Sequence, residues 1–450
     1  MTSSAISVRN LPVDPGPAGW NAILPPQPPA RPLDHDRSAD WLIIGAGLAG
    51  LAAARRLTRT RPGDRIVVLD AVRIAAGPAG RNSGFMIDLP HKLTSETYAG
   101  SLDADRAQIR ANRLAIDFAL AAAADYRMPA EAIVRRGKIN AAATDHGVAH
   151  NAGFRRHLDA LGEESRLLTA ADMQALTGTG YYRDGLFTPH AAMIQPALFV
   201  RHMARGLATD GVAIHENSPV LALQRQPSGG WHARTPDGSV TTGAVILAVN
   251  GHAESFGLFR RRLMHVFTFA AMTRALTPDE VRRLGGEAEW GLTPADPAGT
   301  TVRRVSGTGG DRIVVRNQFV YEPRMRIGEN RLRRIARGLH SAFRHRFPML
   351  PDMEMEYQWG GRLCLSRNDA PAFGEVEPGL YAACCQNGLG TARGTFSGIA
   401  AADLACGNET EFSQHQMAQP HPTRLPPVPF ATFGANLYLK WLERSAGREK

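Results

Sequence analysis

The clearest pattern along the chain is a short apolar run that ends in glycines and leads into apolar residues at helical spacing. Residues 39–71 read ADWLIIGAGLAGLAAARRLTRTRPGDRIVVLDA. This pattern predicts a buried strand, a glycine turn, a helix and a second buried strand. The order is that of a βαβ unit, in which two parallel strands are joined by a crossover helix.

Three later stretches have a similar character. Residues 194–223 read as a helix followed by a strand, and residues 241–253 as an apolar strand that ends in a turn of small residues. Residues 378–407 repeat the order of strand, glycine turn and helix. Because long insertions separate these stretches, we expect one domain that is assembled from non-contiguous segments.

The insertions follow another pattern. Residues 259–276 and 311–325 alternate apolar and polar positions and carry aromatic side chains, as antiparallel strands do. The predicted fold class is therefore α/β, or α+β overall, with a Rossmann-like domain and a second, mainly antiparallel β-sheet domain. The expected segments are 1–38 for a proline-rich extended arm, 39–100, 165–255 and 356–410 for the Rossmann-like domain, 101–164 and 256–355 for the second domain, and 411–450 for a C-terminal tail.

Composition and charge exclude several classes of protein. The 450 residues are 44% hydrophobic and 21% charged, which is ordinary for a globular protein. The net charge of +10 is carried mostly by arginines spread along the chain, so we do not expect nucleic acid as a partner. The four cysteines lack a CxxC motif or metal-ligand spacing, which predicts no metal site and a reduced, cytoplasmic protein. A bacterial source is expected as well.

The two ends of the chain add two expectations. The first 36 residues contain no uninterrupted apolar stretch typical of a secretory signal, and we find no 18-residue apolar run that would span a membrane. The last residues predict a short basic amphipathic helix that carries Leu437, Leu439, Trp441 and Leu442. We expect this helix to dock on the body of the protein, and contact with a membrane surface is the alternative.

The motif with the most chemical information is the G-A-G-L-A-G turn of Gly45, Gly47 and Gly50. The first glycine permits the tight turn, the second lets backbone approach a pyrophosphate, and the third allows the helix to pack closely on the strand. Asp70 ends the second strand, where a carboxylate can bind ribose hydroxyls. Because an acidic residue there disfavours a 2′-phosphate, this unit predicts FAD or NAD as the cofactor.

Four stretches, taken in order, resemble the signatures of the glycine/D-amino-acid oxidase (DAO) family of FAD-dependent oxidoreductases. They are IIGAGLAGLAAARRL, GPAGRNSGF, WGGRLCLSRNDAPAFGEV and GLYAACCQNGLGTARGTFSGIAAADL, within residues 41–406. Within the family, one short motif resembles that of gamma-glutamylputrescine oxidoreductase-like members. That similarity rests on Trp359, Gly360, Gly361, Ser366, Asn368, Pro371 and Gly374.

The resemblance implies FAD as the cofactor, with the Rossmann-like domain as the FAD-binding domain. A cysteine binds the flavin covalently in some relatives, but Cys364 stands at another offset, so we expect non-covalent FAD. Arg81 is expected to neutralise phosphate or to polarise the flavin, and a surface salt bridge is the alternative. The predicted cofactor-binding residues are Gly45, Gly47, Leu48, Ala49, Gly50, Asp70, Ala71, Gly80, Arg81, Asn82, Ser83, Gly84, Val220, Asn387, Gly388, Leu389, Gly390 and Thr391.

The second domain is then expected to provide the substrate pocket. An arginine there often clamps a substrate carboxylate in this family, and Arg316 is the first choice, although it could equally point to solvent. His91 follows the flavin-contact turn and could orient substrate or be structural. The predicted catalytic residues are His91, Asp88, Arg316, Trp359, Tyr321 and His265.

The activity that the resemblance implies is oxidation of the C–N bond of a small-molecule amine or amino acid to an imine. The family does this by hydride transfer to flavin N5, and hydrolysis of the imine follows. Related oxidases place a lysine beside the flavin to activate oxygen, whereas this chain has His265 in that strand. The acceptor is therefore oxygen or, as an alternative, a quinone or protein acceptor. A third hypothesis is that the chain is a flavin-binding subunit of a larger dehydrogenase.

Overall fold

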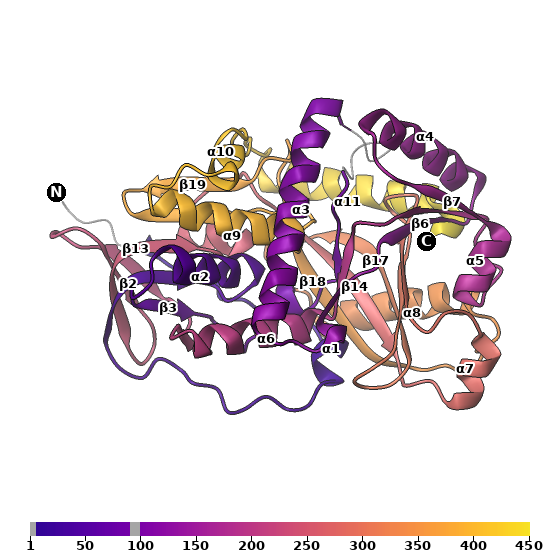
Figure 1. Cartoon of the computed structure of the whole chain (residues 1–450), viewed down its shortest axis with the longest axis horizontal. Helices are drawn as coiled ribbons and strands as arrows, with labels where there is room; N and C mark the ends of the chain where they lie inside the picture. The colour runs from indigo at the N-terminus through magenta and orange to yellow at the C-terminus, as the bar shows by residue number, and fades with distance from the viewer. Residues whose placement is uncertain (1–5, 91–99) are drawn as a thin grey trace.

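A computed structural model describes residues 6–90 and 100–450. The chain folds around two large sheets that lie side by side, one in each half of the molecule (Figure 1). The N-terminal half of the chain contributes strands to both sheets, and so does its last quarter. His91, one of the predicted catalytic residues, lies outside the described residues.

The first sheet has nine strands, and its centre is parallel. Strands β20, β13, β2, β3 and β10 pair in parallel in this order. Parallel pairing brings the carboxyl ends of these strands to one edge of the sheet. The strands are β1 (Ile6–Ser7), β2 (Arg37–Ile44), β3 (Ile66–Leu69), β10 (Ala213–His215), β11 (Ala222–Arg225), β12 (Trp231–Arg234), β13 (Ser239–Leu247), β19 (Ala372–Glu377) and β20 (Leu380–Cys384).

Helices α2 (Leu48–Thr60) and α9 (Ala392–Ala405) pack side by side against the first sheet (Figure 1). Both helices are largely buried, and small residues, alanine and glycine, are frequent among their buried positions. Helix α6 (Pro196–Thr209) packs on α2. It begins at Pro196, and proline is favoured at the first position of a helix.

The second sheet has eight strands in the order β18-β14-β17-β16-β15-β6-β8-β7. All neighbours are antiparallel except β15 and β6. Helix α8 (Glu329–Arg346) packs on β14, β17 and β18. The strands are β6 (Lys138–Ala142), β7 (Arg166–Thr169), β8 (Asp184–Thr188), β14 (Met264–Thr273), β15 (Trp290–Pro294), β16 (Thr301–Val305), β17 (Arg312–Tyr321) and β18 (Met355–Leu365).

A small sheet of β4 (Phe85–Met86), β9 (Ala192–Ile194) and β5 (Ile133–Arg135) lies beside these two. The other α-helices are α1 (Gly19–Ala22), α3 (Leu102–Asp125), α4 (Asp145–Leu161), α5 (Ala170–Thr177), α7 (Pro278–Leu284), α10 (Glu411–Met417) and α11 (Val428–Ser445). Short 3-10 turns are η1 (Pro78–Gly80), η2 (Ala130–Ala132), η3 (Asn250–Phe256) and η4 (Gly447–Glu449). Among the described helices, none has both the length and the apolar character that a membrane span requires.

The two sheets confirm the expected fold class, a parallel-centred α/β unit with a second, mainly antiparallel sheet. Sheet membership differs from the expected segments at several strands: β4, β5 and β9 form the small third sheet, and β1 of the arm joins the first sheet. Strands β7 and β8, inside residues 165–255, and β18, at the start of residues 356–410, all pair in the second sheet. Alternation along a strand predicts which residues are buried, but it carries no information about the strand that pairs with it.

The N-terminal arm is an integrated part of the structure. Trp20 is fully buried, and its indole N–H donates to the Asn82 carbonyl oxygen at 2.8 Å. The Pro15 carbonyl oxygen accepts from the Gly360 N–H at 3.0 Å, which joins the arm to β18. A buried ion pair between Asp14 and Arg362, 3.0 Å apart, holds the same region. The arm therefore ties the two sheets together.

The packing of α2 on β2 predicts a sharp difference between two glycines. A Cβ at Gly50 would meet backbone atoms, whereas a Cβ at Gly338, on an open side of α8, would meet no described atom within 4 Å. We expect Gly50→Ala to lower the free energy of unfolding by about 3 kcal/mol through overpacking. Gly338→Ala should raise it by up to about 1 kcal/mol, because alanine favours helix. Urea unfolding of both variants checks this, and equal stabilities would contradict the packing.

Candidate active site

The site begins at the tight turn between β2 and α2. Gly45 has a φ of +104°, and a Cβ on it would lie 2.6 Å from the Ala248 carbonyl oxygen. A Cβ on Gly50 would lie 1.8 Å from the Gly45 carbonyl oxygen, so the third glycine of the motif makes close helix packing possible. Helix α2 starts at Leu48, and no described side chain caps its first turn. Its N–H groups and partial positive charge are therefore available to a phosphate.

Asp70 stands directly after β3, at the same edge of the first sheet. Its two carboxylate oxygens accept from the backbone N–H groups of Ala46 at 2.8 Å and Val72 at 3.0 Å. Burial nevertheless raises the pKa of Asp70 to about 6. These bonds fix the carboxylate beside the glycine turn, and its remaining lone pairs can accept hydrogen bonds from ribose hydroxyls.

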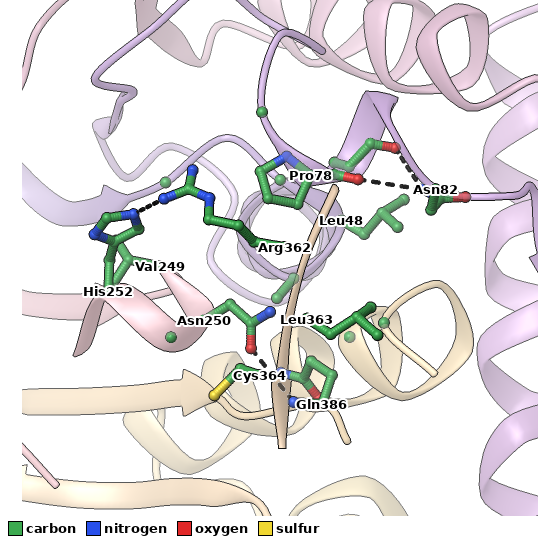
Figure 2. Close-up of a pocket in the computed structure, with 18 of the residues that line it drawn as sticks. Leu48, Pro78, Asn82, Val249, Asn250, His252, Arg362, Leu363, Cys364 and Gln386 are labelled. Carbon is green, nitrogen blue, oxygen red and sulfur yellow. Dashed lines mark hydrogen bonds between the residues drawn. The ribbon is translucent and has the colours of Figure 1, made fainter. Parts of the chain in front are cut away.

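A cavity of about 290 Å³ runs from this turn to the second sheet. Figure 2 shows one part of its wall, where Asn250 points toward Gln386 and Arg362 points toward His252. The lining residues at the first-sheet end include Ile44, Gly45, Ala46, Gly47, Leu48, Ala49, Asp70, Ala71, Val72, Arg73 and Val220. The arm contributes Val8, Asn10, Leu11 and Pro12.

The turn of residues 77–84 forms a second wall. The Asn82 side chain donates to the Ala79 carbonyl oxygen at 2.7 Å and accepts from the Gly84 N–H at 2.8 Å, which keeps the turn compact. Asn82 and Ser83 line the cavity. A Cβ on Gly84 would lie 2.0 Å from Nη1 of Arg303, a buried side chain that donates to the Ser83 carbonyl oxygen at 3.1 Å. Arg303 therefore supports the turn from behind.

Arg81 lies on the other side of this turn. Its guanidinium donates to four backbone carbonyl oxygens, at 2.6 Å to 3.1 Å, and it stands outside the cavity lining. Gly80 is outside the lining too, because it packs against Ala75. The acceptors of Arg81 are the carbonyl groups of Ala76, Pro15, Gly16 and Gly360. The geometry shows Arg81 joining the turn to the arm and to β18, and phosphate neutralisation stays a prediction.

The second glycine turn precedes α9. Gly388, Leu389, Gly390 and Thr391 line the cavity, and the Thr391 hydroxyl donates to the Phe85 carbonyl oxygen. Asn387 is buried behind them, where its side-chain oxygen accepts from the Ser366 N–H at 2.8 Å. Asn387 therefore connects the end of β18 to the turn, and the four residues after it face the cavity. The N-terminus of α9 begins directly after them at Ala392.

The second sheet provides the opposite end of the cavity. His265 lines it from β14, and its Nε2 lies 2.7 Å from Glu254 Oε2. Arg316 lines it from β17, with its guanidinium 5.2 Å from the centre of the Phe319 ring. A β-bulge at Gln318, which has a φ of +62°, interrupts the pairing of β17 just after Arg316. Bulges of this kind re-aim side chains at the edges of sites.

Thr293 also lines this end, and a buried network behind it fixes its hydroxyl. The Thr293 hydroxyl donates to Asn140 Oδ1 at 2.8 Å, and the Lys138 ammonium donates to the same oxygen. Because an ammonium group can only donate, the Asn140 oxygen must face it. Burial lowers the pKa of Lys138 to about 8. Because the Thr293 hydroxyl donates its proton to Asn140, its oxygen can accept a hydrogen bond from a ligand N–H.

Three other predicted residues stand outside the cavity lining. Trp359 is fully buried and donates to the Arg81 carbonyl oxygen at 3.0 Å. Tyr321 is buried on β17 and its backbone pairs with the Asn436 side chain. Asp88 is buried and ion-paired with Arg113 at 3.0 Å. Catalytic roles for these residues remain predictions that the geometry does not favour.

Several lining residues were not predicted from the sequence. Asn250 follows β13 at the same edge as Gly45, and its Oδ1 accepts from the Cys385 N–H at 3.0 Å. Burial and the neighbouring Arg362 lower the pKa of His252 to about 3, so its neutral imidazole accepts from that guanidinium. The apolar strand before Asn250 could have predicted that this residue lies at the site, because residues at the carboxyl ends of parallel strands converge.

Cys364 is the cysteine that meets the cavity. A hydrogen bond with Cys385 and burial both raise the pKa of the Cys364 thiol. The thiol is therefore protonated near neutral pH and is a poor nucleophile. This agrees with the expectation of non-covalent flavin, which stays a prediction.

The residues at the first-sheet end fit a dinucleotide, since a glycine cradle, an uncapped helix start and a fixed carboxylate meet there. The family model for the DAO family, described as "FAD dependent oxidoreductase", matches residues 40–404. "Probable oxidoreductase OrdL" of Rhizobium meliloti is 24% identical over 89% of this chain and 90% of its own. Gamma-glutamylputrescine oxidoreductase of Escherichia coli is 22% identical over 91% and 94%. The structure of glycine oxidase from Geobacillus kaustophilus has a TM-score of 0.69 at 18% identity, covering 87% of this chain and all of that chain.

Asp70 gives this site a testable pH dependence. Hydroxyl donors bind the carboxylate rather than the carboxylic acid, so FAD affinity should fall as the pH drops through about 6. The dissociation constant should rise by roughly tenfold between pH 8 and pH 5, as the carboxylate is protonated. Asp70→Asn should abolish this slope and weaken binding roughly tenfold at pH 8.

The measurement is flavin fluorescence titration of the apoprotein between pH 5 and 8. Asp237→Asn is the matched control, because Asp237 is an exposed carboxylate between β12 and β13. An unchanged pH slope in Asp70→Asn would remove Asp70 from the cofactor site.

Proposed function

The chain belongs to the DAO family of FAD-dependent oxidoreductases, and from this premise we propose that it oxidises the C–N bond of a small-molecule amine or amino acid to an imine. Water then hydrolyses the imine to a carbonyl compound and a free amine. One observation carries the proposal. A single cavity joins the glycine turn and Asp70 at the first sheet to His265, Thr293 and Arg316 at the second. The relatives named for an amine and an amino acid support the same substrate class.

The first-sheet end would hold the cofactor. The N–H groups at the start of α2 would bind the pyrophosphate, and Asp70 would bind the ribose. The turns at residues 82–83 and 388–391 lie between that end and the second sheet and would border the flavin. When bound, FAD supplies the acceptor for the two electrons that leave the substrate.

The second-sheet end would bind the substrate and keep it oriented. The Thr293 oxygen would accept a hydrogen bond from the amine N–H, because its own proton is given to Asn140. Arg316 would bind a carboxylate where the substrate carries one. Pro294, Pro297 and Met325 line the same end and would exclude water from the amine. A dry site favours the neutral amine, which is the form that can be oxidised.

A second candidate differs in the electron acceptor. His265, paired with Glu254, stands on the strand where related oxidases place an oxygen-activating lysine. Lys138 is the lysine on the second sheet, and its ammonium is buried against Asn140 and outside the cavity lining. This favours a dehydrogenase that passes electrons to a quinone or a protein acceptor, with the same oxidation of the amine.

The proposal is tested by adding amines and amino acids one at a time to the purified holoprotein without oxygen. Bleaching of the oxidised flavin absorbance by at least one compound is expected. If the flavin bleaches with none of a broad panel, the chain is a flavin-binding subunit instead. Turnover with an artificial dye and with oxygen, followed by peroxide release, then separates dehydrogenase from oxidase. Fast dye reduction without peroxide is the outcome that His265 favours.

Arg316 predicts a specific loss in the same assay. Arg316→Met should lower kcat/KM for amino acids about 100-fold, because the charged hydrogen bonds to their carboxylate are lost. Amines without a carboxylate should change much less. Arg326→Met serves as the matched control, since Arg326 is exposed in the connection after β17. Equal losses for both substrate classes would contradict a carboxylate-binding role.

A further inference from the structure

Helix α11, near the C-terminus, has one face docked on the second sheet (Figure 1). The Asn436 side chain donates to the Tyr321 carbonyl oxygen at 2.9 Å and accepts from the Tyr321 N–H at 3.1 Å. Glu443 accepts from the Phe319 N–H at 2.9 Å. These bonds to β17 fix the rotation of the helix about its axis. The side of α11 that faces away from β17 is therefore fixed as well.

That outer side is apolar and aromatic. Its residues follow helical spacing, and their exposed fractions run from 50% to 75%. Every exposed large aromatic side chain in the described chain belongs to this helix. The members of this outer face are Phe430, Phe433, Leu437, Tyr438 and Trp441. Contiguous apolar surface of this kind marks an interaction site, because single exposed residues are common but clusters are not.

The charges of α11 identify the partner. Its exposed charged residues are Lys440 and Arg444, both positive. Its acidic residue, Glu443, is buried and paired with Lys450. Two copies meeting through this face would bring cations together with no exposed acid on either helix to match them. An aromatic helix face with cations and no exposed acid is complementary to anionic lipid headgroups above an acyl layer.

We propose that the outer face of α11 docks on the surface of an anionic lipid bilayer. The helix lies in the plane of the membrane, with the aromatic rings at the level of the headgroups and the cations on the phosphates. The proposal rests on α11 alone and holds for either electron acceptor. It also places β17, which carries Arg316, next to the membrane-bound element.

Trp441 provides a direct reporter of this contact. The other tryptophans of the chain, at residues 20, 41, 231, 290 and 359, are all buried. Vesicles of phosphatidylcholine mixed with brominated phosphatidylglycerol should therefore quench mainly Trp441 in the full-length holoprotein. Quenching should be lost in Trp441→Phe, although that variant should still sediment with the vesicles. High salt should weaken the binding, because it screens the headgroup charge.

Three variants complete the test by vesicle sedimentation. Phe433→Ser with Trp441→Ser should weaken binding at least roughly tenfold, because two large apolar groups no longer enter the bilayer. Lys440→Glu with Arg444→Glu should weaken binding to phosphatidylglycerol vesicles strongly. Met417→Ser is the matched control, since Met417 is 55% exposed on α10 and should leave binding unchanged. Retained flavin absorbance shows that each variant is folded.

Two outcomes would overturn the proposal. One is that the parent chain stays in the supernatant with anionic vesicles. The other is that light scattering shows a dimer which Phe433→Ser with Trp441→Ser dissociates, because the face would then join two copies of the chain.

Discussion

The structure depends on close contact between backbones at the glycines of two helices. Gly50 places α2 directly on the Gly45 carbonyl group, and Gly398 places α9 directly on α2, where a Cβ would lie 2.0 Å from the Ala49 carbonyl oxygen. Any side chain at either position would push the layers apart. Because β2, α2 and α9 are stacked so closely, the first glycine turn and the turn of residues 388–391 open into one cavity. The cofactor site therefore follows from packing as much as from the turn itself.

The N-terminal arm adds a second constraint, because it forms part of the site. Asp14 pairs with Arg362 in a buried ion pair, and that guanidinium also holds the neutral His252. Arg81 is bound to carbonyl groups of the arm, of its own turn and of β18. Removing one partner of such a buried pair leaves an uncompensated charge. The arm, the turn of residues 77–84 and β18 are therefore held as one unit.

The sequence predicts the parts of the site that are local in the chain. The turn at Gly45, the carboxylate of Asp70 and the turn before α9 each combine a strand, small residues and a helix within one short segment. Trp359 and Tyr321 were predicted as catalytic residues, yet alternation along a strand does not tell which face of a sheet meets the cavity. Contacts such as Thr293 with Asn140, or Asn250 with the chain at Cys385, join segments over a hundred residues apart and depend on strand order. Such contacts follow from the tertiary structure and not from any local pattern.

One cavity is proposed to hold the cofactor at the first sheet and the substrate at the second. A crystal structure of the holoprotein with a bound substrate or unreactive analogue would show both. We expect the ribose of FAD on Asp70, the flavin ring beside residues 82–83 and 388–391, and the ligand amine between the ring and Thr293. A flavin ring that lies away from the second sheet, or a ligand bound elsewhere, would contradict the proposal.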